Sequence, residues 1–263
     1  MFFKKKTEEP VFLDCYTYSH YAYNHAQIAP SHKYFPEWFK REAKFLDDGS
    51  ATIKNCSAFT DFYTKGIVVP LWGEVEITVN PKSEANEKDV YTWVSSNADF
   101  DLHSMNHPKR QWQGFGDDDT FNIKFVSPWA FKTTELINFT WTQPTWSQPD
   151  TFDNFTALPA VMQFKSQSFT NINYVVKQTA KQQTINLQPL TPMAILHPMT
   201  ERKVEIRTHL VDREKFEKIM TRAGGMLLNA SGNPAAGGGS KSLRSRKERF
   251  WSKADELNKC PFQ

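Results

Sequence analysis

Two histidines four residues apart form the pair in this sequence that is most typical of a metal site. His103 and His107 have the spacing that places two imidazole rings on one face of a helix. Zinc peptidases with this spacing also need a glutamate directly after the first histidine, and Ser104 occupies that position. Because Pro108 and the surrounding Asn and Asp residues disfavour a helix, we predict a solvated loop here and no metal site.

A second group of histidines lies closer to the N-terminus and consists of His20, His25 and His32. The tyrosines interspersed with them are Tyr16, Tyr18, Tyr21 and Tyr23. Three imidazoles can bind a transition metal, and histidine combined with carboxylates can bind iron. The sequence contains no His-x-Asp pair, so we interpret this segment as a polar aromatic surface and predict no metal or other cofactor.

The remaining candidates for chemistry lack the partner residues that their reactions need. The run from Asp117 to Asp119 is contiguous, whereas a calcium loop needs oxygen ligands at alternating positions, and we predict a solvated hairpin turn. Cys56 has no identifiable base, and no Gly-x-Ser-x-Gly motif occurs. Residues 237–241 resemble only part of a phosphate loop. We therefore assign no catalytic residue and favour a protein that is not an enzyme.

The basic excess of the chain is concentrated at its C-terminal end. The net charge is +3 over 263 residues, and residues 237–263 contain seven Lys or Arg and three acidic residues. That segment therefore carries +4 and the rest of the chain −1. Residues 229–240 (NASGNPAAGGGS) have the composition of a flexible linker. We predict a body at 1–228, a linker at 229–240 and a basic arm at 241–263.

The basic arm has the pattern of an amphipathic helix. Leu243, Phe250, Ala254 and Leu257 would share one helical face, with Trp251 at its edge. Basic residues cover much of the remaining surface of this helix. The same segment could instead be a frayed basic extension, or it could contact nucleic acid or a membrane surface. The residues that we predict to bind a partner are Leu243, Arg244, Arg246, Arg249, Phe250, Trp251 and Leu257.

Composition restricts the class of protein. Aromatic residues make up 14% of the chain, with 21 Phe, 8 Trp and 8 Tyr, and such residues favour strands. The three cysteines are odd in number and form no CxxC motif, which indicates a reducing compartment without a disulfide framework. The start MFFKKK lacks the apolar region of a signal peptide, and no run approaches the ~18 apolar residues of a membrane span. We expect neither secretion through a signal peptide nor a membrane partner.

Short segments with two-residue alternation dominate the body. Residues 74–79 and 204–210 alternate most clearly. The other predicted strands lie at 11–18, 67–71, 91–94, 121–126, 136–141, 155–164, 173–177, 184–187 and 193–196. Helical turns are predicted at 34–40 and 58–63, and a longer helix at 212–220 with Asp212 as its N-cap. The chain lacks βαβ alternation, which predicts a mainly β fold, an antiparallel barrel or sandwich with short helical additions and a C-terminal extended or helical arm.

Four segments, taken in order, resemble a known family. They are FPEWFK at residues 35–40, TIKNC through GIVVPLWGEVEI at 52–77, FVSPWAFKT at 125–133 and LQPLTPMAIL at 187–196. Their order and spacing resemble DUF6065, a family of uncharacterised β-rich proteins from bacteria and tailed phages, over about residues 11–210. The resemblance implies a phage or phage-derived origin and a β-rich body, and it supplies no catalytic residues.

The chain departs from the pattern of that family at three places. Thr134-Glu135-Leu136 stands where the family usually has a Pro-Pro-Gly turn. Ser57 follows the cysteine where a proline is common, and the final strand ends in Leu196-His197-Pro198-Met199 instead of Ile-Pro-Phe. The linker and the basic arm lie outside the resemblance.

These observations lead to two hypotheses of function. The first is a non-catalytic phage virion or assembly component, located in the virion or the host cytoplasm. Its C-terminal arm would bind other phage structural proteins or copies of itself, helped by the high effective concentration of a tethered segment, and nucleic acid could be contacted only through this arm. The alternative is a small-ligand-binding protein, or a nucleotide- or metal-dependent enzyme, with an aromatic-lined pocket in the β body.

Overall fold

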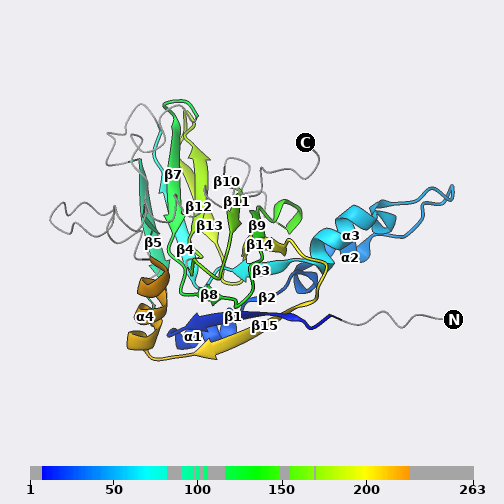
Figure 1. Ribbon diagram of the computed structural model, residues 1–263. Coiled ribbons are helices and arrows are strands. Elements are labelled where there is room, and N and C mark those ends of the chain that lie inside the picture. The colour runs from blue at the N-terminus through cyan, green and yellow to red at the C-terminus, as the bar shows by residue number, and fades with distance from the viewer. Residues whose placement is uncertain are drawn as a thin grey trace, which may run out of the picture.

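The computed structural model describes residues 8–81, 90–96, 99–100, 104–105, 116–147, 155–168 and 170–224 (Figure 1). Strand residues outnumber helical residues between Val11 and Leu210, which confirms the prediction of a mainly β body. The described strands form four sheets, and none of these sheets closes into a barrel.

Two of the four sheets have three strands each. The sheet with the order β15-β1-β8 consists of β15 (Val204–Leu210), β1 (Val11–Thr17) and β8 (Ala130–Lys132). The sheet with the order β13-β4-β5 consists of β13 (Gln183–Leu187), β4 (Glu74–Val79) and β5 (Tyr91–Ser96).

The other two sheets are larger. The four-stranded sheet β10-β12-β7-β6 consists of β10 (Phe155–Ala157), β12 (Ile172–Lys177), β7 (Thr120–Phe125) and β6 (Ser104–Met105). The five-stranded sheet β11-β9-β14-β3-β2 consists of β11 (Ala160–Met162), β9 (Phe139–Thr142), β14 (Pro192–Pro198), β3 (Ile67–Pro70) and β2 (Ala29–Pro30).

One strand pair departs from the antiparallel prediction. β1 pairs in parallel with β15, with Val11 opposite Val204 and Thr17 opposite Leu210, whereas β1 and β8 are antiparallel. The expectation of purely antiparallel sheets is therefore wrong for this pair. The side chains of β1 alternate between buried and half-buried along its whole length, so one face of this sheet meets the core and the other meets solvent.

Two of the observed strands have other bounds than the sequence predicts, one because of a proline and one because of an exposed side chain. The strand predicted at residues 155–164 is divided into β10 and β11, which belong to different sheets. Pro159 lies between them and has no N–H group to continue the ladder. β9 begins at Phe139 instead of Leu136, whose side chain is exposed.

The helices are few and lie outside the sheets. They are α1 (His20–His25), α2 (Glu37–Arg41), α3 (Ser57–Thr64) and α4 (Arg213–Gly224). Asp212 accepts a hydrogen bond from the backbone N–H of Lys215 (2.7 Å), which confirms its predicted role as the N-cap of α4. α1 was not predicted. Ser19 caps it, and the carboxylate of Asp99 accepts hydrogen bonds from the Ser19 hydroxyl and the Tyr21 N–H (2.7 Å each).

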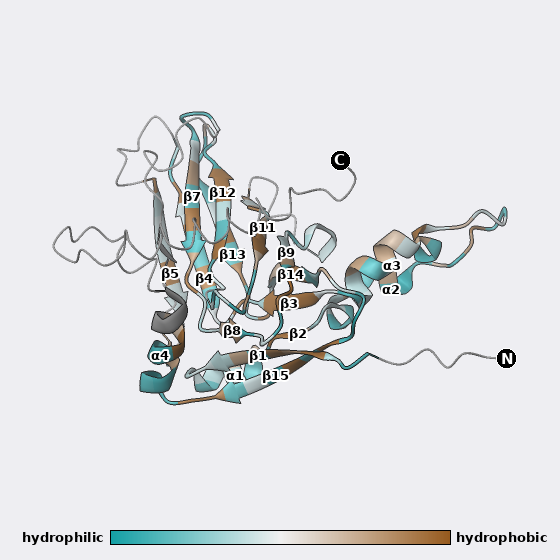
Figure 2. Cartoon of the chain, in the orientation of Figure 1, coloured by the Kyte–Doolittle hydropathy of each residue, from teal (hydrophilic) through white to brown (hydrophobic). Residues whose placement is uncertain are grey.

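All four sheets contribute to one continuous hydrophobic core. Aromatic rings fill much of it: Phe155 stacks on Tyr174 at 4.1 Å between ring centroids, and Phe125 meets both edge-on. The hydroxyl of Tyr174 donates to the carbonyl of Met193 (2.5 Å), so this phenol is buried with its polar atom satisfied. Figure 2 shows the corresponding hydrophobic bands on the strands, with hydrophilic residues on α2 and α4.

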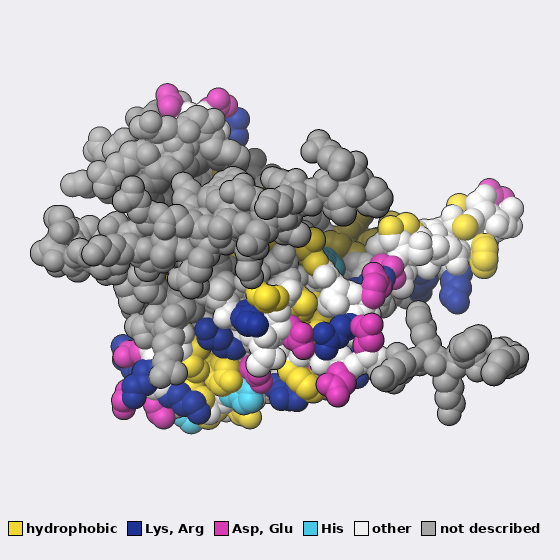
Figure 3. Space-filling model, viewed as in Figure 1, with side chains coloured by type: hydrophobic (Ala, Val, Ile, Leu, Met, Phe, Trp, Pro, Cys, Tyr) yellow, Lys and Arg dark blue, Asp and Glu magenta, His cyan; other side chains and the backbone are white. Residues whose placement is uncertain are grey.

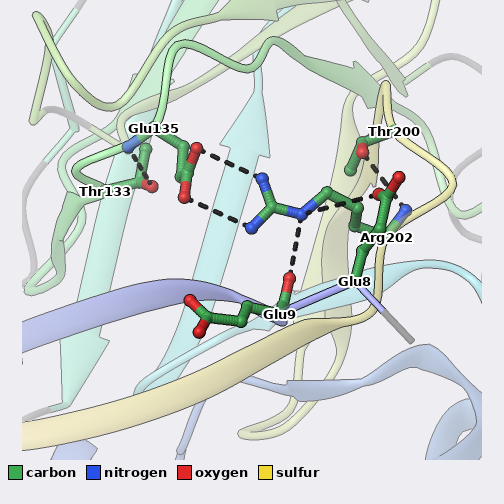
Figure 4. A network of polar contacts seen from close by, with 6 residues as sticks. All are labelled: Glu8, Glu9, Thr133, Glu135, Thr200 and Arg202. Atoms are coloured by element: carbon green, nitrogen blue, oxygen red, sulfur yellow. Dashed lines mark hydrogen bonds and ion pairs between the residues drawn. The ribbon is translucent and has the colours of Figure 1, made fainter. Parts of the chain in front are cut away.

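A salt bridge ties the N-terminal end of the described chain to two distant loops (Figure 4). The guanidinium of Arg202 donates to both carboxylate oxygens of Glu135 (3.2 and 3.3 Å) and to the carbonyl of Glu9 (2.9 Å). Because the Arg–carboxylate contact is bidentate and partly buried, it fixes orientation better than an exposed pair would. It joins the loop before β15 to the segment before β9 and to the start of β1.

Candidate partner-binding surface

Residues 36–65 form a projecting arm that extends away from the sheets (Figure 1). The arm consists of α2, a hairpin and α3, with the short 3-10 segment Ile53–Asn55 between the hairpin and α3. Pro36 at the N-cap and Glu37 in the first turn begin α2, and Lys40 and Arg41 end it, which is the charge order that complements a helix dipole.

An aromatic cluster separate from the main core holds the base of the arm together. The ring of Phe39 in α2 lies 4.5 Å from that of Phe59 in α3, in a tilted arrangement, and 4.9 Å from the ring of Phe35, on which it stacks. Tyr63 and Ile195 are fully buried in the same cluster. Because Ile195 belongs to β14, this cluster connects the arm to the five-stranded sheet.

Polar contacts add to the attachment of the arm. The Ser31 hydroxyl donates to the carbonyl of Tyr63, and the hydroxyl of Tyr63 is hydrogen-bonded to that of Ser147. The Nε2 atom of His197 lies 2.8 Å from the carbonyl oxygen of Phe62, and the two rings are 4.7 Å apart. Burial is the main reason that the pKa of His197 falls below its ordinary value.

Close packing at the end of the arm requires a residue without a side chain. A Cβ atom at Gly66 would lie 2.7 Å from both the Cγ2 of Ile195 and the Oγ of Ser31. Both distances are shorter than van der Waals contact, so glycine lets α3 return directly into β3 at this point.

The hairpin of the arm is held by its own hydrogen bonds. The Leu46 N–H donates to the carbonyl of Ser50 (2.8 Å), and the Ser50 N–H donates to the carboxylate of Asp48 (2.8 Å). Gly49 has a φ of +82°, which other residues rarely adopt. The hairpin therefore has a defined shape without packing against the body.

Large apolar side chains are exposed at the tip and at the base of the arm. At the tip, Phe45 and Leu46 are 58% and 54% exposed, beside one another in the sequence. At the base, Trp38 and Trp146 are 42% and 47% exposed, with ring centroids 6.3 Å apart, and the indole N–H of Trp38 donates to the carbonyl of Trp146 (3.2 Å). Figure 3 shows hydrophobic side chains along the arm among charged ones of both signs.

This arrangement suits binding to another macromolecule. Tryptophan and phenylalanine provide large, rigid contact areas and are enriched in the energetic centres of interfaces. The tip projects away from the described sheets (Figure 1), and apolar groups exposed on a protrusion are typical of contact sites.

The residues predicted from the sequence to bind a partner fall in a part of the chain that the structure does not describe. Leu243, Arg244, Arg246, Arg249, Phe250, Trp251 and Leu257 lie outside the described residues, as do the predicted linker and His103 and His107. The run from Asp117 to Asp119 lies in an exposed turn before β7, where the ammonium of Lys177 is 3.6 Å from Asp119. Cys56 is exposed at the start of α3.

The described residues hold no cluster suited to a metal ion. His20 and His25 lie on α1 and His32 on the 3-10 segment Ser31–Tyr34, and all three side chains are exposed. Nowhere in the described ranges do three or more His, Cys, Asp or Glu side chains gather in a way that could bind a metal. Within the same ranges, every helix is too short or too polar to cross a membrane.

Sequence reasoning missed the exposed arm because it placed only helical turns there. A signal was available at the tip, where two apolar residues directly precede the turn sequence Asp47-Asp48-Gly49-Ser50. A tight turn of this kind leaves adjacent side chains in solvent. The contribution of Trp146 had no local signal, because it reaches the arm from a loop that is distant in sequence.

Comparisons of the chain with protein-family models, with curated proteins and with solved structures find no match.

Proposed function

We propose that this chain is a non-catalytic assembly component that binds its partner through the projecting arm. The observation that carries the proposal is the exposure of Phe45 and Leu46 at the tip of a hairpin that is stabilised by its own hydrogen bonds. A partner with a complementary apolar groove would bury both side chains without reorganising the hairpin, which lowers the entropic cost of binding.

The phage origin of the assembly rests on the resemblance to DUF6065. That resemblance includes the FPEWFK segment, which supplies Phe35, Trp38 and Phe39 to the base of the arm. We also infer that the open sheets form a sandwich-like arrangement, because all four contribute side chains to one core. The basic segment 241–263 is proposed as a second, tethered contact with other structural proteins or with copies of the same chain.

The aromatic-lined ligand pocket of the alternative hypothesis receives less support. The aromatic richness that motivated it is largely used in ring–ring packing, as in the contacts among Phe125, Phe155 and Tyr174 in the core. No described feature favours a nucleotide or a metal-dependent reaction over this packing role, so the assembly function is our conclusion.

The proposal can be tested by replacing the tip side chains in the phage or organism that encodes the chain and measuring incorporation of the variant into assembled particles. Phe45→Ser with Leu46→Ser removes two exposed apolar groups and should leave the fold unchanged, because neither side chain lies in a core cluster. We expect the variant to be expressed and folded but lost from purified particles and assembly intermediates.

A matched control makes this result specific. Leu136→Ser with Val161→Ser removes two equally exposed apolar side chains from elsewhere on the surface (67% and 61% exposed) and should leave incorporation normal. Normal incorporation of the tip variant would contradict the proposal, as would equal losses for both double variants.

A further inference from the structure

β15 is an open edge strand. Its backbone is bonded to β1 on one side, since Val11 N–H donates to the Lys203 carbonyl (2.8 Å) and Val211 N–H to the Thr17 carbonyl (2.9 Å). In a parallel ladder the backbone groups of alternate residues point to opposite sides. The outward-pointing residues are therefore Val204, Ile206, Thr208 and Leu210. Among the described residues, no hydrogen bond reaches their backbone N–H groups.

Apart from its charged residues Glu205 and Arg207, this edge lacks the usual protection against pairing. β15 has seven residues, contains no proline and keeps an unbroken register with β1, whereas natural edges are commonly shortened, bulged or covered. The opposite margin of the same sheet is covered: the N–H groups of Phe131 and Thr133 on the β8 side donate to the carbonyls of Ser168 and Phe164. Within the described residues of this sheet, the open margin is therefore that of β15.

Two residues of opposite charge, Glu205 and Arg207, are neighbours on the solvent face of β15. Glu205, Arg207 and His209 lie on the face away from the core, where the guanidinium of Arg207 lies 3.3 Å from the ring centroid of Phe12 and the His209 ring stacks on Tyr16. Antiparallel self-pairing through the outward backbone groups can be centred on Glu205, Ile206, Arg207 or Thr208. Centring on Thr208 places Arg207 opposite His209, which forms no pair with a carboxylate. Centring on Glu205 or on Arg207 places two like charges directly opposite one another, which is unfavourable.

Centring on Ile206 gives the opposite result. Glu205 of each copy then faces Arg207 of the other, twice by symmetry, in non-hydrogen-bonded positions where cross-strand side chains approach most closely. The competing contact of Glu205 within one copy is a pair with Lys203 (2.8 Å) that is largely exposed, and such pairs contribute little. The edge is therefore self-complementary in one register.

We propose that two copies of this chain associate through antiparallel pairing of their β15 strands, with Ile206 of one copy opposite Ile206 of the other. The two sheets β15-β1-β8 then continue into one sheet across a two-fold axis, and the outward N–H groups of Val204, Ile206 and Thr208 gain partners within the strands. A two-fold axis closes the contact, so the pairing yields a dimer and not a fibre. The inference does not depend on the projecting arm.

The test measures the dimerisation constant of the full-length protein by sedimentation equilibrium. Arg207→Glu and Glu205→Arg each place like charges opposite one another in both symmetry-related pairs and should weaken dimerisation about tenfold or more. The double variant Glu205→Arg with Arg207→Glu restores opposite charges and should recover dimerisation. Recovery by the double variant separates the proposed register from a loss of folding.

A backbone variant tests the pairing independently of charge. Thr208→Pro removes an outward N–H but no hydrogen bond to β1, so the strand should fold, as proline is tolerated at such edge positions. We expect a monomer with an unchanged circular dichroism spectrum. A dimer that persists in Thr208→Pro would overturn the proposal. A wild-type protein that stays monomeric at every concentration would also overturn the proposal. If the amides of Ile206 and Thr208 in that monomer were protected from hydrogen exchange, the edge of β15 would be occupied by another segment of the same chain.

Discussion

At the scale of single residues, His197 couples the attachment of the arm to pH. Its ring packs against Phe62, and its Nε2 atom is hydrogen-bonded to the carbonyl of the same residue. Burial lowers the pKa of His197 in the folded protein below that in the unfolded chain. The unfolded state therefore binds more protons in the interval between the two pKa values, and stability must decrease as the pH falls through that interval.

This linkage predicts the behaviour of His197→Gln. The free energy of unfolding of the wild-type protein should decrease as the pH falls through about 6.5, the ordinary pKa of histidine, and this contribution should be absent in the variant. The difference in free energy of unfolding between the two proteins, measured by urea unfolding across that pH interval, separates the contribution of His197 from that of the carboxylates. A difference that stays constant with pH would refute the assignment.

Some residue roles were predictable from the sequence, and others were not. Asp212 stands directly before a helical pattern, so its capping role follows from local chemistry alone. Asp99 supplies the hydrogen bonds at the start of α1 from a segment far away in the sequence. Because α1 has six residues and depends on that tertiary contact, no local pattern indicates it.

At the scale of elements, the arm divides into a packed base and an exposed tip. Phe59 is 5% exposed and its ring contacts those of Phe35, Trp38, Phe39 and Tyr63. Packing at the base therefore determines whether the arm keeps its shape, and the hairpin determines what the arm presents to a partner.

Phe59→Ala should loosen the arm. Removal of a buried phenylalanine ring leaves a cavity and costs about 3 kcal/mol, so the amides of α2 and α3 should exchange faster with solvent than in the wild type. Val161→Ala is the matched control, since an exposed side chain contributes within about 0.5 kcal/mol. Unchanged exchange in α2 and α3 would show that the ring cluster does not hold the arm.

Strand positions were more predictable than strand partners. β4 and β15 have the bounds that alternation predicts, because one face of each strand meets a core. The parallel pairing of β1 with β15 joins the two ends of the body, and alternation carries no information about which strands pair. The barrel and sandwich alternatives could not be separated from the sequence for the same reason.

At the scale of the whole molecule, we propose that the projecting arm at residues 36–65 and the basic segment 241–263 bind partners of the packed β body. Deletion of residues 229–263 should leave the body folded, because no described residue of the body is removed. The deletion should reduce incorporation into the assembly, since the proposed apolar face of Leu243, Phe250 and Leu257 is lost. Circular dichroism and particle composition measure the two effects. A truncated chain that assembles normally would show that the basic arm is dispensable.

A variant of the basic arm distinguishes its possible partners. Phe250→Ala with Trp251→Ala should weaken incorporation nearly as much as the deletion, because buried aromatic residues dominate interface energies. Charge reversal at Arg244, Arg246 and Arg249 should mainly slow association and increase its dependence on salt. Loss of binding only on charge reversal would point to nucleic acid or an acidic surface as the partner.

We propose that the chain belongs to a multi-protein assembly, and its copy number in that assembly is the most direct test. Particles and assembly intermediates from the encoding phage or cell can be purified and their composition measured by quantitative mass spectrometry. We expect a fixed copy number of this chain relative to the other components. Absence of the chain from both the particles and the intermediates would contradict it.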